Sequence, residues 1–113
     1  MFLTSVSAFA QIEKPVVWSY LAKKISKTEA ILYLKATIDD KWHIYAQNGK
    51  DGGPLKTAFT FNPSTHFKLV GKTIEPKSTV KYEPTFKMNV SYFEKIAVFA
   101  QKVKLNKGNS TIV

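Results

Sequence analysis

The sequence predicts an all-β protein, an immunoglobulin-like β-sandwich of about eight or nine strands. Apolar and polar residues alternate with a period of two in several segments, and no segment shows a sustained helical period. Turn residues separate these segments at intervals of about ten residues. With 113 residues, 44% of them apolar and 13% aromatic, the chain can bury the core of one such domain.

The first two strands are expected to form a hairpin. A strand over about 16–23 is followed by the polar turn Ser26-Lys27-Thr28 and by a second strand over 30–38. In the second strand, every other residue is apolar, which predicts one buried face. That face holds Ala30, Leu32, Leu34, Ala36 and Ile38, and the opposite face holds Tyr33, Lys35 and Thr37.

The third strand is expected over 42–47, with one face in the core and the other available for function. Trp42, Ile44 and Ala46 make up the predicted core face, and His43, Tyr45 and Gln47 the opposite one. Three of the five glycines and Pro54 then predict a loop over 48–54.

Five further strands are expected over 57–61, 67–74, 79–82, 89–93 and 96–105. Turns at Asn62-Pro63-Ser64, Pro76 and Glu94-Lys95 separate most of them, and a loop is expected over 106–109. Residues 111–113 read as the opening of one more strand, so the sandwich is expected to be truncated in its last strand or strands.

Composition argues against several functional classes. The net charge is +9, yet all 17 basic residues are lysines spread along the chain, and Arg, which grips phosphate and guanine bidentately, is absent. We therefore expect a solvated basic surface and no nucleic-acid partner. The absence of cysteine excludes disulfides, thiolate nucleophiles and thiolate metal sites.

No catalytic residue, metal site or cofactor is expected. His43, His66 and Met88 could form a copper site only without the thiolate that blue-copper centres use. No serine lies in a nucleophile elbow. Gly52-Gly53 precedes Pro54 rather than a helix start, so it is not a phosphate-binding loop.

Residues 1–10 have the features of the end of a signal peptide. Phe2–Val6 is apolar, and Ala8-Phe9-Ala10 before Gln11 has the small-x-small pattern of a cleavage site. Cleavage after Ala10 would leave residues 11–113 as an exported domain. No other segment approaches the roughly 18 apolar residues of a transmembrane helix.

Several short motifs, in this order and spacing, resemble the N-terminal periplasmic domain of the thiol:disulfide interchange protein DsbD, the disulfide bond corrector family. The resemblance covers about 14–105. It rests on Lys14-Pro15-Val16-Val17-Trp18-Ser19, Trp42-His43-Ile44-Tyr45, Gly52-Gly53-Pro54, Phe59-Thr60-Phe61, Leu69-Val70-Gly71-Lys72, Tyr82-Glu83-Pro84-Thr85-Phe86 and Tyr92-Phe93-Glu94.

This resemblance implies an immunoglobulin-like sandwich in the periplasm, a monomer that takes part in thiol-disulfide electron transfer. Its partners would be periplasmic thioredoxin-like redox proteins, including those of disulfide isomerisation and cytochrome c maturation, and it would meet the membrane only through a fused or partner domain. By position, Tyr82, Glu83, Pro84, Thr85 and Phe86 resemble the family's cap loop, with Phe86 as the shielding ring. Trp42, His43 and Tyr45 fall where the family has aromatics near its cysteines.

The family's two cysteines are missing from this chain. They lie in and after the strand that would open at 111–113, so either an early end of the frame or a cysteine-free paralogue would account for their loss. Thiol-disulfide exchange requires a thiolate, so the chain alone is expected to be redox-inactive. The alternative is a cysteine-free immunoglobulin-like module that binds a protein or small ligand through Trp42, Tyr45 and Phe86.

Overall fold

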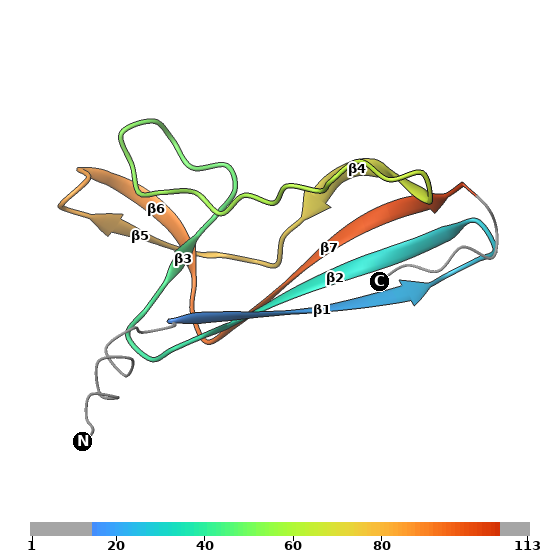
Figure 1. The fold of residues 1–113 in the computed structure, drawn as a ribbon. Helices are drawn as coiled ribbons and strands as arrows, with labels where there is room; N and C mark the ends of the chain where they lie inside the picture. Colours follow the sequence, from blue (N-terminus) through green and yellow to red (C-terminus); the bar gives the residue numbers. More distant parts are fainter. Residues whose placement is uncertain (1–14, 107–113) are drawn as a thin grey trace, which may run out of the picture.

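The computed structural model describes residues 15–106, and this part of the chain contains seven strands and no helix (Figure 1). The predicted all-β class is confirmed. The strands are β1 (Val16–Lys24), β2 (Glu29–Ile38), β3 (Ile44–Tyr45), β4 (Phe67–Ile74), β5 (Thr79–Glu83), β6 (Met88–Phe93) and β7 (Ile96–Leu105).

The strands form two antiparallel sheets. The larger sheet has the order β1-β2-β7-β4 and the smaller has the order β3-β6-β5. Constant-type immunoglobulin domains also divide seven strands into four and three, but with the fifth strand in the larger sheet and the seventh in the smaller. Here β7 lies in the middle of the larger sheet, and the chain passes from one sheet to the other between β6 and β7 (Figure 1).

The β1–β2 hairpin and the two-residue period of β2 are as predicted. The turn is closed by hydrogen bonds from the N–H groups of Ile25 and Ser26 to the carbonyl of Glu29, at 3.0 and 3.2 Å. The even-numbered residues of β2 from Ala30 to Ile38 are buried or half-buried. On the opposite face Lys35 and Thr37 are exposed, but Tyr33 is half-buried, so the alternation in burial is clear only from Leu34 to Ile38. The sheet therefore has an inner face, to which these even-numbered residues belong, and an outer face.

The main core lies where the two sheets meet. It contains Leu34, Ala36, Ile38, Ala46, Phe93, Ala97 and Phe99. Phe99 of β7 is fully buried, and its ring lies 5.4 Å from that of Phe93 of β6 in an edge-to-face pair. Aromatic pairs of this geometry add to the stabilisation that burial itself gives, so Phe99 ties the two sheets together.

The prediction of a strand over 57–61 is wrong. This segment is extended, but its ladder contacts are limited to an isolated parallel bridge between Tyr45 and Lys56 and a 3.0 Å hydrogen bond from Thr57 N–H to the carbonyl of Tyr45. The alternation that suggested a strand has another cause: Phe59 and Phe61 pack on the main core from a segment that has no neighbouring strand.

The strand predicted over 42–47 is shorter than expected, because only Ile44 and Tyr45 pair with β6. Trp42, predicted to be in the core, is 45% exposed, which corrects that expectation. The backbone of Lys41 has φ of 70°, which turns the chain before Trp42. Ala46 is buried as predicted.

A β-bulge interrupts β4, and a buried glutamine of β7 stabilises it. The pairing of β4 with β7 shifts between Val70 and Ile74, where Gly71 has φ of 71°. The side-chain nitrogen of Gln101 donates to the carbonyls of Val70 and Gly71, at 3.3 and 3.2 Å. Gln101 thereby satisfies carbonyl groups that the bulge removes from the ladder.

Two predictions lie outside the described residues. They are the signal-peptide remnant over 1–10, with its cleavage after Ala10, and the strand expected to open at 111–113. The loop expected over 106–109 is described only at Asn106.

Candidate functional site

Of the residues with a predicted role, His43 and Tyr45 lie on the smaller sheet, close to Tyr92. Tyr45 of β3 pairs with Tyr92 of β6, and the ring of His43 lies 4.5 Å from that of Tyr92, edge to face. Nε2 of His43 is 3.4 Å from a carboxylate oxygen of Glu94, so the two form an ion pair when the imidazole is protonated. On the other side of β6, Nζ of Lys81 lies 5.7 Å from the centre of the Tyr92 ring.

The predicted cap-loop residues form the end of β5 and the turn to β6. Residues 84–87 make a tight hairpin turn, in which Phe86 N–H donates to the carbonyl of Glu83 at 3.1 Å and Lys87 has φ of 54°. Glu83 and Met88 pair at the base of this turn. Phe86 is half-buried, while Tyr82, Pro84 and Thr85 are exposed.

The structure does not bring the two groups of predicted site residues together. Glu83 pairs with Met88 at the first residue of β6, whereas Ile44 pairs with Phe93 at the last. The turn that carries Phe86 lies at one end of the smaller sheet. Trp42 precedes Ile44, so it lies beyond the other end. Within residues 15–106, Phe86 takes part in no aromatic ring pair.

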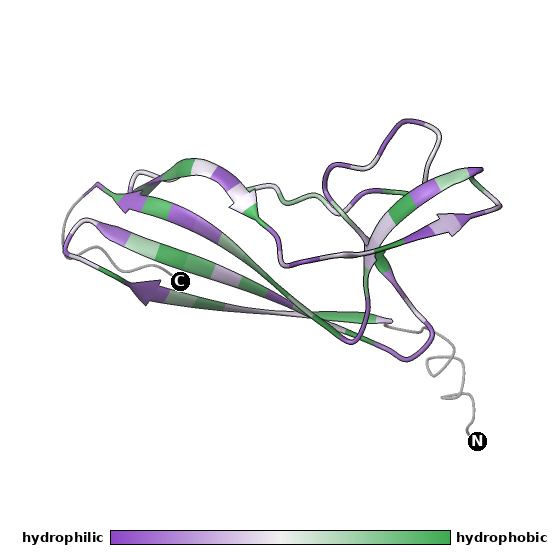
Figure 2. Ribbon diagram, turned by 180° about the vertical axis from the view of Figure 1, so that it is seen from behind, coloured by the Kyte–Doolittle hydropathy of each residue, from purple (hydrophilic) through white to green (hydrophobic). Residues whose placement is uncertain are grey.

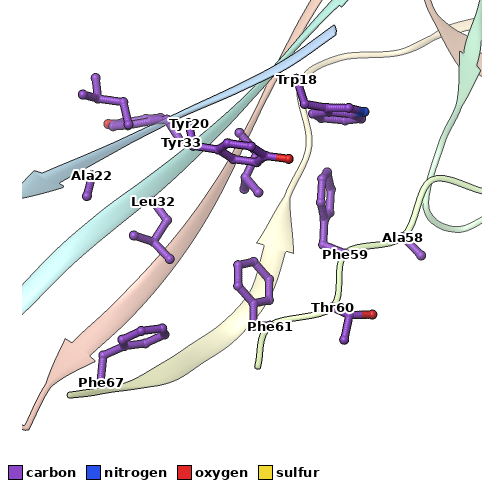
Figure 3. A pocket seen from close by; sticks show the side chains of 12 residues that line it. Trp18, Tyr20, Ala22, Leu32, Tyr33, Ala58, Phe59, Thr60, Phe61 and Phe67 are labelled. Carbon is purple, nitrogen blue, oxygen red and sulfur yellow. The ribbon is translucent and has the colours of Figure 1, made fainter. Parts of the chain in front are cut away.

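A hollow in the described part of the chain lies elsewhere, mainly on the inner face of the larger sheet. It is an open groove of about 820 Å³ between the β1–β2 hairpin and the extended segment 58–61 (Figure 3). The residues that line it are Trp18, Tyr20, Leu21, Ala22, Leu32, Tyr33, Leu34, Ala58, Phe59, Thr60, Phe61 and Phe67. Leu21 and Tyr33, which pair with each other, belong to the outer face of the sheet. Small-molecule and cofactor sites occupy volumes of roughly 300–1,000 Å³. We call this hollow the aromatic groove.

One end of the aromatic groove is built by a cluster of packed rings. The rings of Trp18 and Phe59 are 5.3 Å apart and nearly perpendicular, and both contact Phe99 of the core, at 6.0 and 5.0 Å. Figure 3 shows Trp18 and Phe67 near opposite ends, with Phe59 and Phe61 along one side. This packing holds the segment 58–61 in place without strand pairing.

The side of the groove formed by β1 is open. Tyr20, which lies between Trp18 and Ala22 on the inner face of β1, is 71% exposed, while Leu32 and Leu34 beneath it are half-buried and buried. No charged residue lines the groove, and Tyr20 is the lining residue with a polar side chain on the inner face of β1 and β2. Such a surface favours flat or branched apolar groups, with few hydrogen bonds to orient them.

A second hollow, lined by both polar and apolar residues, lies along β4 and shares Phe59 and Phe61 with the aromatic groove. Gln47 lines this hollow and links the sheets, because its backbone N–H and its side-chain nitrogen both donate to one oxygen of Glu75, at 3.0 and 3.1 Å. The same nitrogen donates to the carbonyl of Thr73, whose hydroxyl donates to Gln101. These groups satisfy one another, so their role is structural rather than reactive.

The described residues contain no group of three or more His, Asp or Glu side chains that could hold a metal ion. In the same part of the chain, no helix has the length and apolar character needed to cross a membrane. No protein family, curated protein or solved structure matched this chain when it was compared with them.

Sequence reasoning assigned the groove residues to the core and did not find the groove. One signal was present: β1 carries apolar residues on both faces, with Trp18 and Tyr20 on one and Val17 and Leu21 on the other. A strand at the edge of a sheet that faces water on one side needs apolar residues on only one face. Which of them stay uncovered depends on the strand order, which the sequence does not display.

Proposed function

We propose that this chain is a binding module without catalytic chemistry of its own, and that the aromatic groove is its binding site. The proposal rests on the shape and lining of this open groove, which has a volume of about 820 Å³ and no charged lining residue. The rings of Trp18 and Phe59 pack on Phe99 of the core, whereas Tyr20 on the β1 side stays exposed. Aromatic side chains give large contact areas at low entropic cost, because they have few rotatable bonds. The ligand would be a protein segment or a small apolar molecule.

A fluorescent apolar dye, anilinonaphthalene sulfonate, tests the groove in the folded 113-residue chain. Dye emission should rise and saturate, and Tyr20→Asp should weaken binding roughly tenfold, because it puts a charge at the uncovered side. Tyr82→Asp is the matched control: Tyr82 is also exposed, at 58%, but belongs to the smaller sheet. Equal loss of binding in both variants, or no saturable binding, would exclude the groove.

A second candidate comes from the resemblance to the DsbD N-terminal domain. We propose, as this alternative, a periplasmic partner of thioredoxin-like redox proteins that is redox-inactive in the form of this chain. In its favour, the cap-loop residues form a tight turn that contains the half-buried Phe86, on the same sheet as His43 and Tyr45. Export with cleavage after Ala10 belongs to this proposal, and a mature protein that starts at Gln11 would support it.

The reading frame beyond Val113 and the thiol chemistry of the protein distinguish the two candidates. A cysteine pair trailed by Pro-Pro in that frame would favour the redox candidate, and a frame without cysteine would favour the binding module. Insulin reduction by the 113-residue chain should stay at background, because it contains no thiol. Turnover above background would contradict both candidates.

A further inference from the structure

One edge of the larger sheet, that of β1, has no partner strand in the described part of the chain. All nine residues of β1 pair with β2 on one side, and no described strand lies on the other. In a strand, successive residues direct their N–H and C=O groups to alternate sides, so about half of the backbone groups of β1 point away from the sheet. An unpaired edge of this kind is a template for another strand.

The other long edge in the described part of the chain is protected, and that of β1 is not. β4 carries a bulge, Gly71 with positive φ, and the lysines Lys68 and Lys72. These are the features by which proteins block edge pairing. In contrast, residues 16–22 of β1 contain no charge, proline or glycine, and the deepest purple of this strand lies at its Lys23-Lys24 end (Figure 2).

The same edge forms the open side of the aromatic groove. Trp18, Tyr20 and Ala22 alternate along the inner face of β1 and all three line the groove. A strand added beside β1 would continue this pleat and direct every second side chain onto the uncovered side of the groove. One extended segment could thus satisfy the free backbone groups and cover the exposed Tyr20 at once.

Charge indicates which segment fits. Lys23 and Lys24 end β1, and Lys27 lies in the adjoining turn; all three are exposed. Three more lysines, Lys68 of β4 and Lys102 and Lys104 of β7, lie at the same end of the sheet. Glu29 is the acidic residue there, and it pairs with Lys102 at 3.2 Å. The chain as a whole carries +9. This end therefore attracts acidic groups and repels a second copy of the chain.

We propose that the edge of β1 takes up an extended segment of an acidic partner protein, by strand addition. The segment runs antiparallel to β1, directs alternate apolar side chains into the aromatic groove and carries acidic residues at its N-terminal end, beside Lys23 and Lys24. This inference rests on the proposed function, because it uses the same groove. It adds the class of ligand and the backbone pairing that holds it.

The probe is a blocked synthetic peptide in which three acidic residues precede four Val-Thr repeats. Calorimetric titration of the 113-residue chain should show saturable binding. The double substitution Lys23→Glu and Lys24→Glu should lower the affinity for the peptide roughly tenfold or more. Tyr20→Asp should weaken it similarly. Ile74→Lys, at an exposed position on the opposite edge, is the matched control and should leave the affinity unchanged. Circular dichroism confirms that each variant is folded.

Hydrogen exchange separates strand addition from simple burial in the groove. Bound peptide should slow exchange of backbone amides within 16–22 at least tenfold and leave those of β4 unchanged. Peptide binding without this protection would overturn the inference. Edge amides that are already protected without peptide would also overturn the inference, because the chain itself or a second copy would then cover β1. Sedimentation distinguishes these two cases, since only the second copy raises the molecular mass.

The result with the dye keeps this inference separate from the proposed function. Dye binding that depends on Tyr20, together with no peptide binding, would overturn strand addition and leave the groove as a site for small apolar ligands. Loss of both would remove the groove as a binding site. Peptide binding unaffected by the two lysine substitutions would refute the acidic partner.

Discussion

At the scale of single residues, two phenylalanines differ in environment. Phe99 is fully buried, and its ring meets the rings of Trp18, Phe59 and Phe93. Phe86 is half-buried in a turn. Burial of the ring, rather than residue type, sets the cost of removing it.

Phe99→Ala should lower the free energy of unfolding by about 3–5 kcal/mol, because it leaves a cavity between the two sheets. Urea denaturation followed by fluorescence measures the change. Ala97 lies on the same face of β7 but its side chain is already small, so Ala97→Gly serves as a control for the backbone of that strand. A loss below about 1 kcal/mol for Phe99→Ala would mean that the sheets do not meet at this ring.

Phe86→Ala should cost well under the roughly 3–5 kcal/mol of a core phenylalanine, because the ring is only half-buried. The same denaturation experiment measures it. A second readout applies if the frame after Val113 supplies the cysteines: in that longer chain, losing the shielding ring should speed reaction of the disulfide with small thiols. A core-sized destabilisation with an unchanged exchange rate would show that Phe86 is ordinary packing.

Gln101→Leu should destabilise the protein by about 1–3 kcal/mol, because it leaves the carbonyls of Val70 and Gly71 without their donor. Thr73→Val removes a single hydrogen bond to the same side chain, so it should cost less, roughly 1 kcal/mol. Thermal melts of both variants give the comparison. If Gln101→Leu were neutral, the bulge in β4 would not depend on this glutamine.

At the scale of elements, the alternation of apolar residues predicted strands correctly where a strand pairs with a neighbouring strand on each side. In β2, the alternation from Ala30 to Ile38 predicted the buried face, because β2 lies between two strands and one side of it faces the core. At 57–61, the same alternation predicted a strand that does not form. Two phenylalanines anchored to a core produce that pattern whether or not a neighbouring strand is present.

The site was less predictable than the strands. The predicted residues Trp42, Tyr45 and Phe86 were chosen by local motifs. Only Tyr45 lies in a strand of the smaller sheet, whereas Trp42 precedes β3 and Phe86 lies in the turn between β5 and β6. The aromatic groove joins side chains from β1, β2, β4 and the segment 58–61. Its existence depends on β1 lying at the edge of the sheet, which is a property of the strand order and not of any local pattern.

The bulge in β4 depends on Gly71, whose φ is positive. Gly71→Ala should cost about 1–2 kcal/mol, because φ of 71° is unfavourable for a residue with a Cβ. A Cβ there would meet no atom within 4 Å, so the cost is conformational and not steric. Gly71→Asn should therefore be milder, since Asn tolerates this region better. Equal losses in denaturant melts would indicate a clash instead.

At the scale of the whole molecule, the two sheets share one main core, and no helix is present in residues 15–106. Far-UV circular dichroism of the chain should accordingly show a strand-type spectrum. A helical double minimum would contradict the fold. Adding reductant should leave the spectrum and the melting temperature unchanged, because there is no disulfide to break.

The central position of β7 has a consequence for how the protein is made. During synthesis, β1, β2 and β4 leave the ribosome before β7, yet β7 separates β2 from β4 in the sheet. Until it emerges, the nascent chain holds a hairpin with two open edges and an uncovered apolar face, and such intermediates aggregate readily. We expect the newly made polypeptide to need a chaperone until Leu105 is available, and to become independent of it only when its last described strand enters between its neighbours.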